Sequence, residues 1–153
     1  MLICFKWATF TSGLFIFWVL LETLLFRFGI LTFKDNDFSF YPVILGLSFP
    51  FMYYGIKEIR RFNDYRLLSF KEGVKYGLII TFFVSSLTSV FIYYYYKYIH
   101  KFLNGVEFLI TSEFYYNPFV QSFYQFTYSL FAGLVALTVS SVILVNSPKI
   151  EQY

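Results

Sequence analysis

The chain has 153 residues, of which 58% are hydrophobic, 26% aromatic and only 14% charged. Soluble domains carry about 25% charged residues, and a soluble core of this length could not hide so much Phe and Tyr. The net charge of +3 comes from short basic stretches between apolar runs, which argues against a nucleic-acid surface. One cysteine and one histidine exclude an intrachain disulfide and a Cys/His metal cage. The composition predicts an integral membrane protein.

The first apolar stretch runs from Trp7 to Phe26, between Lys6 and Arg27. Its first half resembles the apolar region of a signal peptide, but no small-x-small cleavage pattern follows. We therefore expect an uncleaved first span. It contains Glu22, the one acid inside a predicted span.

The second stretch, Tyr41 to Ile56, lies within 19 uncharged residues. Pro42 suits a first helical turn, where its missing N–H costs nothing. Pro50 falls in the middle of the stretch and is expected to bend the helix or open its hydrogen-bond ladder. The densest charge run of the chain follows this span, and we expect it to form a basic loop.

The third stretch begins with Ser69-Phe-Lys-Glu72, the pattern of a capping box. In this motif the Ser69 side chain accepts a hydrogen bond from the Glu72 backbone N–H, and the Glu72 side chain accepts one from the Ser69 backbone N–H. The 21 uncharged residues between Lys75 and Lys97 match a hydrocarbon core of about 30 Å. The four consecutive tyrosines that end this span predict an aromatic collar at the membrane interface.

Residues 99–116 place apolar side chains near helical spacing, which predicts a short helix lying along the membrane surface. Asn117 and Pro118 then form a helix start, an N-cap before a first-turn proline. A helix from Pro118 to Val145 would be about 42 Å long, so the fourth span must tilt or project from the membrane.

These stretches predict an all-α fold, a single bundle of four transmembrane helices with spans at about residues 7–26, 41–56, 76–96 and 126–145. With both termini inside, eight of the twelve lysines and arginines lie on the cytoplasmic side. Cytoplasmic loops carry an excess of Lys and Arg, so we expect both termini to be cytoplasmic.

Residues 60–99 contain Arg-Arg-Phe-Asn-Asp-Tyr, then Leu-Ser-Phe-Lys-Glu-Gly-Val-Lys-Tyr-Gly-Leu-Ile-Ile, and then a tyrosine-rich span end. This order resembles domain-of-unknown-function family 4199, a family of small four-span bacterial inner-membrane proteins. Ala132, Gly133 and Ser140 fit the small residues of that family's fourth span. The resemblance implies a multi-pass protein of the bacterial cytoplasmic membrane. It transfers no catalytic residue, because the family has no established activity.

Small residues recur at every fourth position of the third span, where they allow helix backbones to approach closely in lipid. We interpret this row as packing within the bundle, with a docking ridge for a partner protein as the alternative. An every-fourth row drifts by about 40° per step, so we expect only Gly77, Thr81 and Ser85 to share one straight neighbour. The predicted helix-packing residues are Gly73, Gly77, Thr81, Ser85 and Ser89 in the third span, and Ala132, Ala136 and Ser140 in the fourth.

Two charged features carry further hypotheses. Glu22 lies roughly 7 Å inside the outer membrane edge and is expected to be a hydrogen-bond anchor, with Tyr93, Tyr94 or Tyr128 as partners. A proton relay or cation site is the alternative. The basic residues of the second loop are expected to set topology, with anionic-lipid binding as a generic addition. They are Lys57, Arg60, Arg61, Arg66, Lys71 and Lys75.

The sequence predicts no catalytic residues, cofactor or metal, because active sites need convergent titratable groups. Our first hypothesis is a non-enzymatic accessory or scaffold subunit that packs against a partner through its small-residue helix faces. We expect it to contact membrane lipids and to bind a larger membrane protein complex or further copies of itself. A small oligomeric transporter or channel, with Glu22 and the Pro50 break lining its path, is the alternative. A membrane enzyme is the third and least favoured hypothesis.

Overall fold

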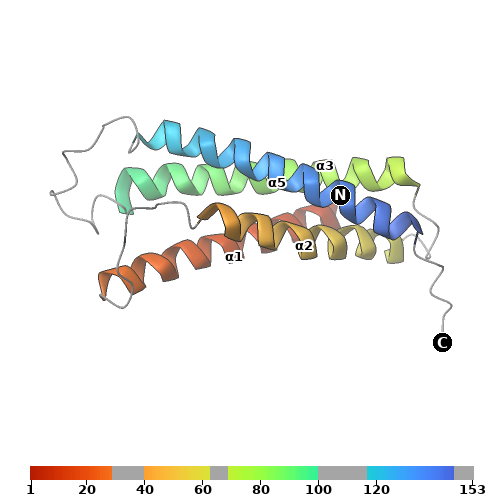
Figure 1. The fold of residues 1–153 in the computed structure, drawn as a ribbon, viewed down its shortest axis with the longest axis horizontal. Coiled ribbons are helices and arrows are strands. Elements are labelled where there is room, and N and C mark those ends of the chain that lie inside the picture. The colour runs from red at the N-terminus through yellow and green to blue at the C-terminus, as the bar shows by residue number, and fades with distance from the viewer. Residues whose placement is uncertain (29–39, 63–68, 100–116, 147–153) are drawn as a thin grey trace.

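The computed structural model of this chain describes residues 1–28, 40–62, 69–99 and 117–146, and all regular structure in these ranges is helical. The predicted all-α fold is confirmed. The helices are α1 (Leu2–Arg27), α2 (Phe40–Phe62), α3 (Phe70–Tyr94), which continues as the π-helical turn η1 (Tyr95–Ile99), and α5 (Pro118–Asn146). They lie side by side and alternate in direction (Figure 1). The interfacial helix expected over residues 99–116 falls almost entirely outside the described residues.

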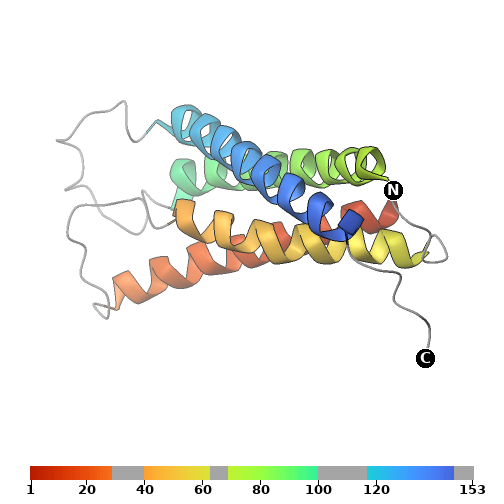
Figure 2. The ribbon, with the colours of Figure 1, turned by 45° about the vertical axis from the view of Figure 1, so that its right-hand side comes forward.

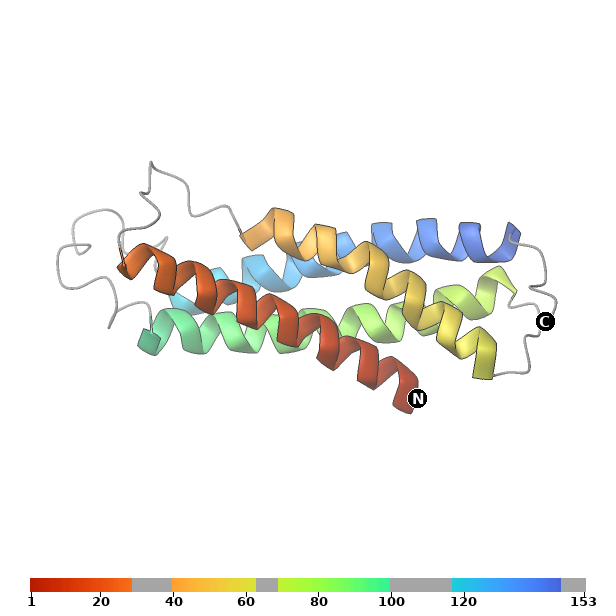
Figure 3. The ribbon, with the colours of Figure 1, turned by 90° about the horizontal axis from the view of Figure 1, so that it is seen from below.

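The four helices form a ring in the order α1, α2, α5, α3. α3 packs most extensively against α5, and the other three sides of the ring are α2 on α5, α1 on α3, and α1 on α2. The two diagonal pairs touch far less. The start of α1 and the end of α5 lie at the same end of the bundle (Figure 3).

Two helices begin as their sequences predict. Ser69 caps α3: its side chain accepts a hydrogen bond from the Glu72 backbone N–H at 3.3 Å, and the Glu72 carboxylate accepts one from the Ser69 N–H at 3.0 Å. Asn117 caps α5, with its Oδ1 accepting from the Phe119 N–H at 2.9 Å. Both caps satisfy backbone donors that have no partner inside the helix. α1 differs, since it begins at Leu2 and carries Lys6 within its helix.

The interior of the bundle is rich in hydroxyl groups, while large apolar side chains cover the outside. Phe15 and Ile44 are fully buried, and so are the hydroxyl-bearing residues Thr81 and Ser85. Exposed apolar residues occur along α1, α3 and α5, among them Phe17, Trp18, Phe82, Phe131 and Val142. A water-soluble protein rarely leaves so much contiguous apolar surface open, whereas lipid would cover it.

Three of the helices are long and apolar enough to cross a membrane, over Leu2–Leu25, Phe70–Ile99 and Pro118–Leu144. α2, which holds the second expected span, is not among them, and its last turns carry Lys57, Glu58, Arg60 and Arg61. α2 is one continuous helix through Pro50, whose side chain is exposed on the outside. The expected break of the helix at Pro50 is therefore wrong, and the expected bend there stays a prediction. A proline ring removes one backbone hydrogen bond, and the neighbouring bonds keep the helix intact.

The four tyrosines at the end of α3 do not form a uniform collar. Tyr94 is exposed, whereas Tyr95 and Tyr96 are buried at 4% exposure each, so the collar prediction is wrong for these two residues. Tyr95 opens the π-helical turn, and its hydroxyl lies 2.8 Å from Thr23 Oγ1 on α1. This hydrogen bond gives the buried phenol the polar partner it needs.

Candidate functional site

The most extensive helix contact is the one between α3 and α5, here called the seam. Gly73 and Gly77 are buried against α5: a Cβ added to them would lie 2.9 Å from Ser141 Oγ and 2.9 Å from Leu137 Cβ, respectively. On the opposite helix, a Cβ added to Gly133 would lie 2.7 Å from Thr81 Oγ1. No side chain fits in these spaces, so the glycines are what allows the two backbones to approach.

Toward the other end of the seam, hydroxyl groups replace glycines. Ser89 Oγ donates to the Ser122 carbonyl at 2.9 Å and lies 2.8 Å from Ser122 Oγ. Ser129 Oγ lies 3.3 Å from Thr88 Oγ1 and accepts from Gln125 Nε2 at 2.8 Å. The Ser89–Ser122 and Thr88–Ser129 contacts join α3 to α5, while the bond from Gln125 to Ser129 lies within α5.

The seam is longer than the sequence predicts. Gly73 and Ser89 both contact α5, so the expectation that only the middle of the row meets one neighbour is wrong. α3 and α5 are inclined to each other (Figure 2). The ridge formed by every fourth residue winds slowly around its helix. A neighbouring helix that is inclined to the axis can stay in contact with this ridge over its whole length, so all five residues of the row can face α5. The other predicted packing residues, Ser85, Ala132, Ala136 and Ser140, are all buried.

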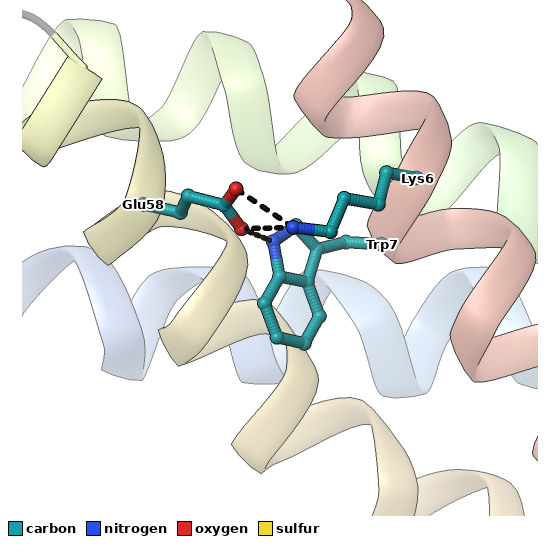
Figure 4. A network of polar contacts seen from close by, with 3 residues as sticks. All are labelled: Lys6, Trp7 and Glu58. Carbon is teal, nitrogen blue, oxygen red and sulfur yellow. Dashed lines mark hydrogen bonds and ion pairs between the residues drawn. The ribbon is translucent and has the colours of Figure 1, made fainter.

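A second junction, here called the clasp, joins the start of α1 to the end of α2 through Lys6, Trp7 and Glu58. Lys6 Nζ lies 2.8 Å from Glu58 Oε1 and 3.0 Å from Oε2, and Trp7 Nε1 donates to Glu58 Oε2 (Figure 4). The Lys6 ammonium lies 5.5 Å from the centroid of the Trp7 ring, and Trp7 stacks on Tyr54. Hydrogen bonding from Lys6 lowers the pKa of Glu58, because it stabilises the charged carboxylate.

The predicted basic loop divides between two helices. Lys57, Arg60 and Arg61 belong to α2, and Lys71 and Lys75 belong to α3, while Arg66 lies outside the described residues. Arg60 is only 6% exposed and donates to the Leu144 carbonyl of α5 at 3.1 Å. A guanidinium at the last carbonyls of a helix satisfies orphan acceptors and meets the negative end of the helix dipole. Arg60 therefore ties α2 to α5 and is not a free lipid-binding charge.

Glu22 lies partly buried in the last two turns of α1. Its Oε2 atom is buried and has no hydrogen-bond partner among the described residues. Neither Tyr93, Tyr94 nor Tyr128 bonds that oxygen, although the adjacent Thr23 bonds Tyr95. The anchoring role expected for Glu22 stays a prediction.

An exposed, largely apolar groove of about 650 Å³ runs along α1, and we call it the outer groove. Gly13 lines it, with open space where a Cβ would be. The remaining lining residues are Phe5, Lys6, Trp7, Thr9, Phe10 and Leu14. Thr9 and Gly13 are four residues apart, a short small-residue pattern that the sequence analysis did not use. Among the described residues, no three His, Cys, Asp or Glu side chains gather closely enough to hold a metal ion.

Comparison with known proteins gives one finding. No curated protein and no solved structure matches the chain. The family described as protein of unknown function DUF4199 matches residues 6–146, nearly the whole length. The chain belongs to this family, DUF4199, as the motifs of residues 60–99 suggest.

Proposed function

We propose that this protein is a non-enzymatic accessory or scaffold subunit of the bacterial cytoplasmic membrane, and that an apolar helix of a larger membrane protein binds in its outer groove. The outer groove is the observation that carries the proposal. The small-residue rows of α3 and α5 face each other in the seam and leave no room for a partner. The exposed small residues of α1 supply the alternative face.

We infer that α2 also crosses the membrane, as the second of four spans. Residues 43–56 of α2 hold no charge, and the helix lies beside three helices that are long and apolar enough to cross a membrane. The end of α2 lies at the same end of the bundle as the starts of α1 and α3 (Figure 3), and these starts carry Lys6, Lys71 and Lys75. This accumulation of basic residues supports a cytoplasmic location for that end and for both termini.

The chemistry of the outer groove suits a helix from another protein. Its lining is almost wholly apolar, and it includes the large side chains of Phe5 and Phe10 together with Gly13, which has none. Between membrane helices, close packing and not the hydrophobic effect drives association, so a concave face binds a helix better than a convex one. Lys6 lies at the end of the groove, in reach of the membrane surface.

Site-specific photo-crosslinking in intact membranes tests this proposal. A photoreactive amino acid at Thr9 is expected to give one discrete protein adduct, and the same group at Gly46 on the outside of α2 is expected to give none. Mass spectrometry then identifies the partner. An adduct of twice the chain's mass would contradict the proposal in favour of a homo-oligomer, and adducts with lipid alone would contradict any protein partner.

Two glycine variants provide a matched pair for the same experiment. Gly13 and Gly46 are both exposed, and neither has an atom within 4 Å of an added Cβ. Gly13→Leu fills the outer groove and is expected to abolish the adduct formed from Thr9. Gly46→Leu adds the same bulk outside the groove and is expected to leave the adduct intact. Equal loss in both variants would show that the groove has no special role.

A small oligomeric transporter remains the second candidate, because an intramembrane carboxylate with an unpaired buried oxygen is a typical feature of ion pathways. Pro50 lies on the outside of α2, so it could line a path only between copies of the chain. Proteoliposomes that carry proton or sodium flux, and that lose it in a Glu22→Gln variant, would favour this function over a scaffold.

A further inference from the structure

A small cavity lies between the four helices of the bundle, each of which contributes lining residues. The space that the centre of a water molecule can occupy in it is about 10 Å³. Four hydroxyl groups line it, one from each helix: Thr11 of α1, Ser48 of α2, Thr81 of α3 and Ser129 of α5. All four residues are at least 94% buried. The cavity lies beside the seam, since Gly133 also borders it.

The hydrogen bonds of these hydroxyls define what the cavity can accept. Thr11 Oγ1 donates to the Trp7 carbonyl and Ser48 Oγ donates to the Ile44 carbonyl, both at 2.7 Å. Each therefore has only oxygen lone pairs left to offer. Thr81 Oγ1 is buried and has no hydrogen-bond partner among the described residues, so both its proton and its lone pairs are available.

We propose that this cavity is a binding site for one ordered water molecule. Water has two protons to donate, which match the lone pairs of Thr11 and Ser48, and it can accept the proton of Thr81. The volume is that of a single water. The water links α1, α2 and α3 through hydrogen bonds that the side chains cannot make directly.

The polar groups of the cavity wall favour water over an empty cavity and over a bound cation. A cavity that stays empty is typically apolar, whereas this one has four hydroxyl groups in its wall. A hard cation takes about six or more oxygen ligands, usually with carboxylates or free carbonyls among them. The cavity wall has neither a carboxylate side chain nor enough hydroxyls, and an uncompensated charge at this depth is costly.

Nuclear magnetic resonance of the full-length protein in lipid nanodiscs tests the proposal. With methyl groups of Thr and Ala labelled, magnetisation transferred from water is expected to reach the γ2 methyls of Thr11 and Thr81. The methyl of Ala136 is the control, because it is fully buried and Ala136 is not among the residues that line this cavity. It is expected to show no transfer. Absence of transfer to Thr11 and Thr81 would overturn the proposal.

Two further arms of the experiment sharpen the outcome. Thr81→Val keeps the shape of the side chain and removes the hydroxyl, so transfer from water to Thr11 is expected to fall severalfold, while Thr81→Ser is expected to retain it. Unchanged transfer in Thr81→Val would overturn the role of Thr81 as a donor. Replacing sodium by choline is expected to leave the Thr11 and Thr81 signals in place, and a shift would assign the cavity to a cation instead.

Discussion

The seam and the clasp join helices by opposite means. In the seam, glycines and small hydroxyl-bearing residues let the backbones of α3 and α5 pack closely, as at Gly133 and Thr81. In the clasp, long side chains bridge α1 and α2, and the Lys6 side chain is 62% exposed. Close packing works at any depth of a bilayer, whereas an ion pair gains from an aqueous edge where its charges need not be fully dehydrated. We therefore expect the seam to carry more of the stability than the clasp.

The largest expected effect is in the seam, at Gly77. A leucine there would need space that Leu137 already occupies, because even a bare Cβ would lie 2.9 Å from Leu137 Cβ. Overpacking of this kind costs about 3 kcal/mol when the neighbours cannot move. Unfolding by SDS titration of the detergent-solubilised protein would measure the loss. Gly46→Leu is the control and is expected to change the free energy of unfolding by no more than about 0.5 kcal/mol.

Gly133→Ala tests the same junction with a single methyl group. The added carbon would meet the β-branched Thr81 side chain, which has little rotamer freedom in a helix. We expect a loss of about 2 kcal/mol in the free energy of unfolding. Thr81→Ala removes the clashing atoms, so the double variant is expected to recover part of the loss. If the two effects simply add, Gly133 and Thr81 are not coupled as the structure indicates.

Arg60→Met is expected to cause the next largest loss in the free energy of unfolding. It deletes a buried guanidinium that donates a hydrogen bond to the end of α5, and it keeps an apolar side chain. Hydrogen bonds to charged groups contribute about 1.5 to 3 kcal/mol. We expect a loss of about 1.5 kcal/mol, measured as a lower midpoint in the same titration. Arg61→Met changes the exposed neighbour and is expected to have little effect. Equal effects of both variants would mean that only the number of basic residues matters.

Glu58→Gln removes the ion pair of the clasp and is expected to cost only about 0.5 to 1 kcal/mol, as exposed pairs do. Because salt screens exposed charges, the difference between wild type and variant should shrink at high ionic strength. Thermal unfolding at low and high sodium chloride concentration would measure it. A loss as large as that of Gly77→Leu would reverse the ranking of the two junctions.

The smallest effect concerns pH. The folded-state pKa of Glu58 lies below its ordinary value of 4.5, so the clasp contributes fully above about pH 4.5 and is lost as the pH falls through the folded value. The difference in unfolding midpoint between wild type and Glu58→Gln is therefore expected to be constant from about pH 6 to 8 and to vanish in acid. A difference that grows on acidification would contradict the assignment of Glu58 as the charged partner.

The sequence by itself determined the apolar helices, the caps at Ser69 and Asn117, and the small-residue row of α3. These features are local, since each depends on residues within a few positions of one another, and helix periodicity or length makes them visible.

Only the tertiary structure decided which distant residues meet. Lys6 and Glu58 are 52 positions apart, and Arg60 and Leu144 are 84 apart, so no spacing rule connects them. The ring order of the helices also lies beyond the sequence, and it decides that the row of α3 faces α5 while Thr9 and Gly13 face outward. Four apolar helices of similar length can be arranged in several ways in lipid, and the contacts of individual side chains across their faces select one of them.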